Sequence, residues 1–414
     1  MLEGGTGIAG RRLVLGVAGG IAAYKSCVLV RRLREAGASV EVILTRGGAK
    51  FVGPVTFEAL SGHPVRRSLW ADGQALDHVR LAHDPDLIIV APATAHLIAR
   101  AALGLADDLL TAVLLARTGP VLLAPAMNDR MYAAPPTQAH FASLVARGWH
   151  VVGPEIGPLA EGESEAPGRM SEPETILRHA ARVLSRGGPL AAKRVVVTAG
   201  PTREALDPVR VITNRSSGKM GYRLAEAAWF RGAEVTLISG PSREPAPTGV
   251  ELVRIESTVE LQDAVARRLP AADVLLMAAA PADFRPARVA AVKSPRQDGA
   301  LHLDLLPTED ILSATRALRK AGAVIVGFAL ETGDAVAKAR AKLERKDVDL
   351  IIVNDALEPG AGFEVDTNRV TILSRRGDPR PVPLQQKAAV AEAILDAVEA
   401  ELSGRTAALS ADPG

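Results

Sequence analysis

The stretch Leu13-Val-Leu-Gly-Val-Ala-Gly-Gly-Ile-Ala-Ala-Tyr-Lys25 decides the fold class of the first half of the chain. Its first six residues form a short apolar run, which predicts a buried strand over 13–18. Gly19 and Gly20 follow as a turn, and the charged continuation from Lys25 to Glu35 predicts an amphipathic helix. A strand, a glycine turn and a helix are the opening of a βαβ unit.

The same alternation repeats along the first half. Apolar runs recur with helix-length segments between them, at 13–18, 40–44, 87–92, 121–126 and 150–153. Because these runs are continuous, both faces of the strands should be covered, which indicates a doubly wound, mainly parallel and flavodoxin-like sheet. The spacing of Leu177, Ala180, Ala181 and Leu184 predicts a closing helix.

A break containing glycine and proline at 185–192 predicts a domain boundary near residue 190, and hence domains 1–190 and 191–414. The second half then repeats the pattern, with apolar runs at 195–198, 235–239, 274–279, 301–306, 324–330, 350–353 and 370–373. These runs predict a second Rossmann-like α/β domain with a mixed or mostly parallel sheet. The tail 404–414 lacks apolar periodicity, and we expect it to be disordered.

Composition limits the function classes. The 49 basic and 47 acidic residues are dispersed, with a net charge of +2, so we expect no nucleic-acid partner. No uncharged apolar run approaches the ~18 residues that span a bilayer, so no membrane segment is expected. Arg11-Arg12 before the first run mimics a targeting signal, but the strand and helix reading is favoured. The single Cys27 agrees with a reducing cytoplasm. No histidine or cysteine motif predicts a metal site.

The second half carries candidate ligand segments at strand ends. In open parallel sheets ligands lie beyond the carboxyl ends of strands, so residues after Thr198, Ala279 and Leu330 should face one crevice. The segment Asn214-Arg-Ser-Ser-Gly-Lys-Met-Gly221 opens a helix whose start can offer N–H groups to an anion. It is not a Walker loop, because Thr213 stands where that spacing requires glycine. An ordinary strand–helix turn remains the alternative.

Lysine placement adds to this interpretation. Only ten lysines occur in the chain, so each position is informative. A lysine is a compact point charge that suits moving phosphates. Four of them lie in the candidate ligand segments of the second half: Lys219, Lys293, Lys342 and Lys346. A solvated helical face is the alternative for the last two.

The ordered motifs of the second half resemble one family. They are Thr198-Ala-Gly-Pro-Thr-Arg-Glu204, Asp207-Pro-Val-Arg210, Asn214 to Gly221, Ala278-Ala-Ala-Pro-Ala-Asp283, Gly327-Phe-Ala-Leu-Glu-Thr332 and Asn354-Asp355. Over about 193–400 the chain is similar to the phosphopantothenate-cysteine ligases. That family activates the carboxylate of 4′-phosphopantothenate with CTP and releases pyrophosphate. The amine of cysteine then displaces CMP from the acyl-cytidylate.

The resemblance implies roles for particular residues. Asn214 would contact the phosphopantothenate carboxylate and the acyl intermediate, and Lys293 would neutralise charge at the reacting phosphate. Mg²⁺ would accompany CTP. Residues expected to contact CTP are Met277, Ala278, Ala279, Asp283, Glu309, Asp310, Ile311, Leu312, Phe328, Lys342 and Lys346. Glu309 departs from the family, in which proline is common at this position.

The first half carries its own ordered motifs: Leu76-Asp-His-Val-Arg80, Ala91-Pro-Ala-Thr94, Asp107-Asp-Leu109 and Ala124-Pro-Ala-Met-Asn128. Over about 11–185 it resembles the flavin-dependent phosphopantothenoylcysteine decarboxylases. The resemblance implies FMN as cofactor, with His78 as catalytic base and Asn128 holding the substrate carboxylate. Residues expected to contact FMN are Gly19, Gly20, Ala91, Pro92 and Thr94.

One departure leaves alternatives open. Glu161 stands where the family commonly has a proton-donating cysteine in a flap, and Glu161 itself is a hypothetical donor. The chain is therefore either a bifunctional coenzyme A biosynthesis enzyme, or an active ligase fused to a flavin-binding domain whose decarboxylase activity is lost or altered. A nicotinamide oxidoreductase is disfavoured, because the G-x-G-x-x-G at Gly5–Gly10 precedes the first strand. The resemblance also implies a homo-oligomer, with a dodecamer among its options.

Overall fold

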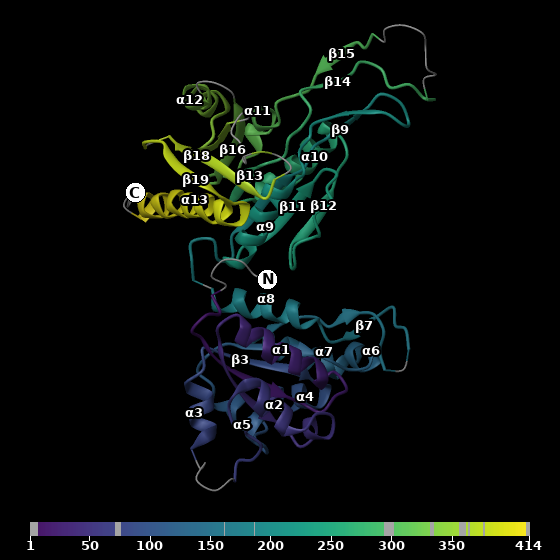
Figure 1. The fold of residues 1–414 in the computed structure, drawn as a ribbon, viewed down its shortest axis with the longest axis vertical. Helices are drawn as coiled ribbons and strands as arrows, with labels where there is room; N and C mark the ends of the chain where they lie inside the picture. Colours follow the sequence, from purple (N-terminus) through teal and green to yellow (C-terminus); the bar gives the residue numbers. More distant parts are fainter. Residues whose placement is uncertain are drawn as a thin grey trace. The chain divides into compact units, whose positions relative to one another are not determined.

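The computed structural model describes residues 7–70, 76–160, 162–185, 187–293, 302–331, 335–355, 362, 365–375 and 377–410. The chain divides into two compact units, 1–186 and 187–414 (Figure 1). This division falls inside the glycine- and proline-containing break, a few residues before the boundary expected near 190. Each unit has its own sheet and its own buried core.

The sheet of the first unit has five described strands, and every neighbouring pair is parallel. The strands are β1 (Arg12–Val17), β2 (Ser39–Leu44), β3 (Leu87–Ala93), β4 (Val121–Pro125) and β5 (His150–Val151). Their order, β2-β1-β3-β4-β5, is that of flavodoxin-like doubly wound sheets. The predicted fold class is confirmed for this unit.

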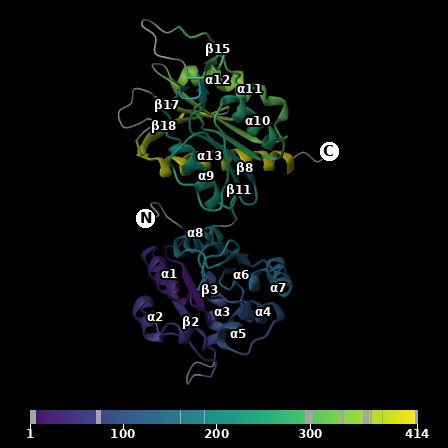
Figure 2. The same ribbon diagram turned by 90° about the vertical axis from the view of Figure 1, so that its right-hand side faces the viewer.

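Helices cover both faces of the first sheet (Figure 2). They are α1 (Ala23–Glu35), α2 (Pro54–Ser61), α3 (Asp77–His83), α4 (Ala95–Leu103), α5 (Leu109–Ala116), α6 (Asp129–Ala133), α7 (Pro135–Ala146) and α8 (Pro173–Leu184), with the short turn η1 (Gly48–Lys50). Helices α1 and α8 pack together on one face. Buried side chains of α3, α4, α5 and α7 pack on the other. A small ribbon joins β6 (Glu155–Ile156) to β7 (Pro167–Arg169).

The main sheet of the second unit is larger and mixed. Its strands are β8 (Arg194–Ala199), β11 (Glu234–Ser239), β12 (Glu251–Arg254), β13 (Val274–Met277), β16 (Val324–Glu331), β17 (Leu350–Asp355), β18 (Thr367–Ser374) and β19 (Arg380–Gln386). They follow the order β12-β11-β8-β13-β16-β17-β18-β19. Pairs are parallel as far as β17, and β18 and β19 return antiparallel. The prediction of a mixed, mostly parallel sheet is confirmed.

Helices again cover both faces of this sheet. They are α9 (Lys219–Phe230), α10 (Thr258–Arg268), α11 (Ile311–Ala314), α12 (Ala335–Lys346) and α13 (Lys387–Ser410), with the turns η2 (Leu269–Ala271) and η3 (Arg316–Leu318). Helices α9 and α13 pack on one face, and α10, α11 and α12 contribute buried side chains to the other. Two ribbons flank the sheet, β9 (Arg203–Ala205) with β10 (Val211–Thr213) and β14 (Phe284–Pro286) with β15 (Leu305–Pro307).

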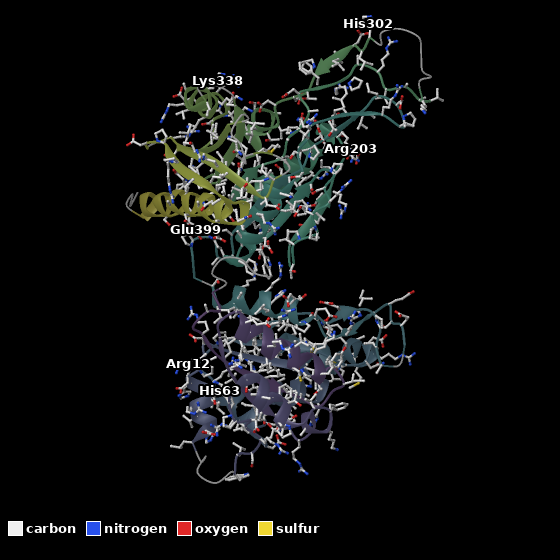
Figure 3. All side chains as sticks on the ribbon, viewed as in Figure 1. Arg12, His63, Arg203, His302, Lys338 and Glu399 are labelled. Atoms are coloured by element: carbon white, nitrogen blue, oxygen red, sulfur yellow. The ribbon has the colours of Figure 1, made fainter. Side chains whose placement is uncertain are left out.

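A charge cluster joins α9 to α13. The guanidinium of Arg231 lies 2.8 Å from an Asp396 carboxylate oxygen and 2.9 Å from one of Glu399, and it also pairs with Glu392. Glu399 lies on α13 (Figure 3). The Arg231 side chain is only 17% exposed, so the cluster fastens the two helices at a half-buried position.

Two sequence expectations need correction. The apolar run at 301–306 does not enter the main sheet, because in its described part only Leu305 and Leu306 are in a strand, which pairs in the β14–β15 ribbon. The tail was expected to be disordered from 404, but α13 continues to Ser410. An established helix extends readily through a sequence such as Thr406-Ala-Ala-Leu409, because alanine and leucine favour helix.

Candidate active sites

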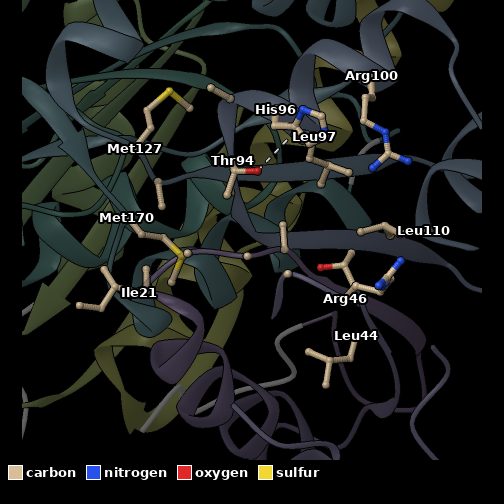
Figure 4. A pocket seen from close by; sticks show the side chains of 18 of the residues that line it. Ile21, Leu44, Arg46, Thr94, His96, Leu97, Arg100, Leu110, Met127 and Met170 are labelled. Carbon is tan, nitrogen blue, oxygen red and sulfur yellow. Dashed lines mark hydrogen bonds between the residues drawn. The ribbon is translucent and has the colours of Figure 1, made fainter. Parts of the chain in front are cut away.

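A cavity of about 1030 Å³ opens at the carboxyl ends of the strands of the first unit. Gly19 and Gly20 after β1, Thr94 after β3 and Asn128 after β4 all line it. Figure 4 shows Thr94 facing this space between Met127 and Leu110. The structure therefore brings four of the predicted site residues to one cavity.

The turns after β1 and β2 approach each other backbone to backbone. A Cβ atom on Gly19 would lie 2.8 Å from the Cα of Gly47, so the approach requires glycine. This contact brings Thr45, Arg46 and Gly47 to the cavity. The sequence analysis did not single out these three residues. Their place directly after the buried strand β2 was the signal that could have found them.

Helix α4 begins at the cavity. Thr94 is its N-cap, and the Thr94 hydroxyl accepts a hydrogen bond of 3.4 Å from the amide of Leu97 (Figure 4). The first-turn residues Ala95 and His96 line the cavity. A helix N-terminus is a favourable position for an anion. Ala91 and Pro92, also predicted to contact FMN, are buried in β3 and do not line the cavity.

The cavity has a cationic lining. Its charged residues are Lys25, Arg46, Arg67, Arg100 and Arg169 against Asp107 and Asp108. Arg100 binds Asp108 at 2.9 Å and also pairs with Asp107. Burial opposes ionisation of Asp108, but the amide of Thr111 and the guanidinium of Arg100 lower its pKa below the usual value. Both acidic groups are thus paired. Lys25 and Arg169 share the carboxylate of Glu172, so the positive charge left at Arg46 and Arg67 favours an anionic ligand.

The orientation of Asn128 is fixed by the helix that it caps. Its Oδ1 accepts hydrogen bonds from the amides of Arg130 at 2.9 Å and Met131 at 3.4 Å. The amide nitrogen is therefore the end that can donate to a carboxylate. Gly168 packs on the adjacent Met127, where an added Cβ would lie 2.6 Å from the Met127 carbonyl oxygen. The Gly168–Met170 segment and Asn128 form one wall of the cavity.

Two predicted catalytic residues are not placed at this cavity. His78 lies in the first turn of α3, is half-buried and does not line the cavity of its own chain. Glu161 lies outside the described residues. Its neighbours Pro158, Leu159 and Ala160 do line the cavity.

The second unit has a cavity of about 630 Å³ at the carboxyl ends of β13, β16 and β17 and at the start of α9. The structure brings together here seven of the residues predicted for the ligase: Asn214, Ala278, Ala279, Asp283, Phe328, Lys342 and Lys346. These residues come from four separate segments of the chain. The predicted crevice at the strand ends is present.

Asn214 is tied to the strand-end loop across the cavity. Its Nδ2 donates to the carbonyl oxygens of Ala280 at 3.1 Å and Pro281 at 3.0 Å. The start of α9 is equally close to β8, since a Cβ on Gly221 would lie 2.5 Å from the Cβ of Ala199. Gly218 precedes the helix with φ 83°, a left-handed conformation that favours glycine. These contacts explain the glycines of the Asn214–Gly221 segment.

Several predicted CTP-contacting residues do not line this cavity. Met277 is buried at the end of β13, where its sulfur accepts from the Thr198 hydroxyl at 3.4 Å. Ile311 and Leu312 are buried in the core beside α12. Lys293, which was predicted to be catalytic, is exposed and is not among the residues that line the cavity. Glu309 accepts a bond of 2.8 Å from the side chain of Gln262.

The cavity lysines are paired with carboxylates. Lys346 lies 2.7 Å from Asp310, and Lys342 pairs with Glu331. Asp310 also caps α11 by accepting from the amide of Ser313 at 3.1 Å. Although burial opposes it, the hydrogen bond from Lys346 holds the pKa of Asp310 below its usual value. Asp310 is therefore linked to the cavity through Lys346.

Two cavity residues were missed by the sequence analysis. Lys387, the first residue of α13, is 4% exposed and lines the cavity together with Asn368, which is 2% exposed. Asn368 Oδ1 accepts from the side chain of Asn354 at 2.8 Å. Because lysines are scarce in the chain, the position of Lys387 directly after a strand was a usable signal.

Within the described residues, no group of three or more His, Cys, Asp or Glu is placed to hold a metal ion. In the same part of the chain, no helix is long and apolar enough to cross a membrane.

Comparisons with known proteins cover both units. A family model described as DNA/pantothenate metabolism flavoprotein C-terminal domain matches residues 190–402, and a flavoprotein model matches residues 4–185. The chain is 47% identical over 412 residues to the coenzyme A biosynthesis bifunctional protein CoaBC of Mycolicibacterium smegmatis, covering 95% of this chain and 99% of that protein. It is 45% identical to the Bacillus subtilis protein of the same name, covering 94% and 97%.

A solved C-terminal domain of a CoaBC protein is 37% identical, covering 53% of this chain and 100% of that one, with a TM-score of 0.45. The whole-length matches do not favour a decarboxylase domain reduced to a scaffold, and the flavoprotein match does not favour a nicotinamide oxidoreductase. The chain belongs to the CoaBC family of bifunctional coenzyme A biosynthesis enzymes, in which a flavoprotein decarboxylase domain precedes a ligase domain.

Proposed function

We propose that the second unit joins 4′-phosphopantothenate to cysteine with CTP, through an acyl-cytidylate, and that the first unit decarboxylates the phosphopantothenoylcysteine product to 4′-phosphopantetheine. One observation carries this proposal: segments that are far apart in the sequence meet at one cavity in each unit. The soluble substrates, and Cys27 as the only cysteine, fit a cytoplasmic reaction.

In the ligase, Asn214 would orient the reacting carboxylate, and Lys342 and Lys346 would bind the phosphates of CTP. The support is geometric, because all three residues line the same cavity. Both N–H groups of the Asn214 amide donate to the Ala280 and Pro281 carbonyls, so contact with a carboxylate oxygen requires Asn214 to exchange one of these bonds. Lys293 would have to approach from its exposed position. With no carboxylate cluster among the described residues, Mg²⁺ would arrive on the phosphates of CTP with its waters.

In the decarboxylase, FMN fits the first cavity. The glycine turn after β1 and the N-terminus of α4 suit a phosphate, and apolar side chains such as Leu110 and Met170 suit the flavin ring. When bound, FMN would supply reversible two-electron chemistry: the cysteinyl thiol would be oxidised before carbon dioxide leaves, and the same two electrons, with a proton, would reduce the decarboxylated product to 4′-phosphopantetheine. Asn128 would donate its amide N–H to the substrate carboxylate, and the cationic lining would draw the anionic substrate in.

His78 requires a second copy of the chain in this proposal. It is absent from the cavity lining of its own chain, so a catalytic His78 has to reach the cavity of a neighbouring copy. A shared site of this kind requires a homo-oligomer of at least two copies, and the dodecamer is proposed from the family resemblance alone. Mixing His78→Asn and Asn128→Asp subunits tests it. Restored decarboxylation in mixed oligomers is the expected result, and none in any ratio would refute the shared site.

Glu161 remains the proposed proton donor. In the sequence it stands between Pro158–Ala160 and Gly168–Met170, which line the cavity. Desolvation of a carboxyl group raises its pKa, and a protonated carboxyl group can donate a proton. Glu161→Gln should abolish decarboxylation while leaving ligation intact. Unchanged release of CO₂ would remove the assignment.

One assay tests the whole proposal. Purified full-length protein with 4′-phosphopantothenate, cysteine and CTP should yield pyrophosphate, CO₂ and 4′-phosphopantetheine, and ATP in place of CTP should be a poorer substrate. Adding phosphopantothenoylcysteine directly isolates the decarboxylation step. If no CO₂ is released from phosphopantothenoylcysteine, the first unit is a flavin-binding domain without decarboxylase activity.

A further inference from the structure

Lys387 occupies an unusual position in the second unit. It is the first residue of α13, yet basic side chains are normally favoured at the other end of a helix. It is also 4% exposed, and buried lysines are rare unless paired. Contacts of the Lys387 side chain have to offset the cost of both its burial and its position at the start of a helix.

Its partners supply these contacts. Lys387 Nζ donates to the carbonyl oxygens of Gly362 at 2.9 Å and Val365 at 2.6 Å, and its backbone amide donates to the carbonyl of Asp366 at 2.9 Å. We name Gly362, Val365 and Asp366 the wall residues, because Gly362 lines the ligase cavity and the other two follow it closely. One lysine thus holds three carbonyl groups of the wall.

A second lysine holds the same wall from α9. Lys219, the first residue of that helix, donates to the Asp366 carboxylate at 2.6 Å. Two residues beyond Asp366, Asn368 contacts Asn354 at 2.8 Å, and both asparagines line the cavity. The wall residues therefore connect the start of α9, which belongs to the Asn214–Gly221 segment, with α13 and the end of β17.

We propose that Lys387 is a positioning residue for ligation: as an ammonium ion it fixes the wall residues, and through Asp366 and Lys219 it fixes the side of the cavity that holds 4′-phosphopantothenate. This inference rests on the proposed function of that cavity. Lys387 acts through the wall and through Lys219, whereas the proposed CTP-binding lysines, Lys342 and Lys346, come from a different helix, α12. Loss of Lys387 should therefore affect one substrate more than the other.

The charge of Lys387 gives the proposal a pH signature. Burial, and then the positive charge of Lys219, lower the pKa of Lys387 to about 8, although Asp366 and Glu244 act in the opposite direction. Arg223 of α9 also faces Asp366. Below that pKa the ammonium holds the wall, and above it one of its N–H donors is lost. An arginine at 387 would stay charged throughout this range.

The test compares Lys387→Met and Lys387→Arg with the wild-type enzyme by ligation kinetics between pH 6.5 and about pH 9.5. Lys387→Met should raise KM for 4′-phosphopantothenate at least about tenfold, with KM for CTP changed less than about twofold. Lys387→Arg should keep most activity at neutral pH and extend it to higher pH. The matched control Lys320→Met removes an exposed lysine of the same unit that does not line the cavity.

Urea unfolding followed by circular dichroism reports whether the second unit of each variant is folded, since decarboxylation takes place in the other unit. If Lys387→Met does not fold, the arginine variant decides alone. A Lys387→Arg enzyme with the wild-type pH profile, or a Lys387→Met enzyme with wild-type KM for 4′-phosphopantothenate, would overturn the proposal. A wild-type enzyme without any ligation would instead refute the proposed function, so the two failures can be told apart.

Discussion

Replacing Asn214 by aspartate tests the ligase site most directly. The Asn214 amide nitrogen donates to two carbonyl oxygens, at 3.1 and 3.0 Å. An ionised aspartate cannot donate, so both bonds are lost and a carboxylate oxygen faces two carbonyl oxygens. Each lost bond is worth about 1 kcal/mol net, and the repulsion adds about 1–2 kcal/mol. The sum of about 3–4 kcal/mol corresponds to a decrease of about 10²–10³-fold in ligation.

The assay follows pyrophosphate and phosphopantothenoylcysteine in the same reaction. We expect product formation to stall, because the added negative charge lies where the reacting carboxylate has to be oriented. Decarboxylation of added phosphopantothenoylcysteine is the internal control, since it takes place in the other unit. Product formation within about twofold of wild type would refute the assignment of Asn214. A urea-unfolding transition like that of the wild-type enzyme shows that the second unit of the variant is folded.

Three further predictions concern stability. Arg231→Ala should lower the free energy of unfolding of the second unit by about 2–3 kcal/mol in urea titrations, because it leaves three carboxylates without their shared partner; Arg231→Lys should lower it less. Gly221→Ala should cost about 1–3 kcal/mol by the same measurement, since its Cβ would lie 2.8 Å from the Thr198 carbonyl oxygen; an unchanged midpoint would contradict the close approach. Burial, and then Arg182, lower the pKa of His179 to about 4. As pH falls from about 6.5 to about 4, the unfolded chain binds a proton at this histidine before the folded chain does, so the free energy of unfolding declines over that range. His179→Gln should make this decline smaller.

The fold could be predicted because its strands are buried on both faces. Strands such as Leu87–Ala93 are fully buried, and this burial is what makes the apolar run continuous in the sequence. The prediction that the run at 301–306 belongs to the main sheet was wrong for the complementary reason. Leu305 and Leu306 are more than 40% exposed in a ribbon, and an apolar run alone does not specify which sheet a strand joins.

The site could be predicted where it depends on strand ends. Asn128 and Ala279 follow parallel strands and Phe328 lies in the second half of β16, and the rule that ligands bind at strand ends places all three at a cavity. The strand-end rule does not cover Lys387. This residue follows the antiparallel strands β18 and β19 and reaches the cavity from the first position of α13. Only the scarcity of lysines and its position directly after a strand mark Lys387 in the sequence, and neither feature shows that its side chain reaches the cavity.

The family motif also implied CTP contacts for residues whose side chains are buried in the core. Ile311 and Leu312 stand next to Asp310 in the matched segment, but their side chains are buried in the core. Any contact that they make with CTP would have to be through the backbone at the start of α11. Asp310 differs, because its carboxylate caps that helix and holds Lys346 at the same time. Within one motif, then, Asp310 links the cavity to the fold through Lys346, while its apolar neighbours anchor the segment that carries it.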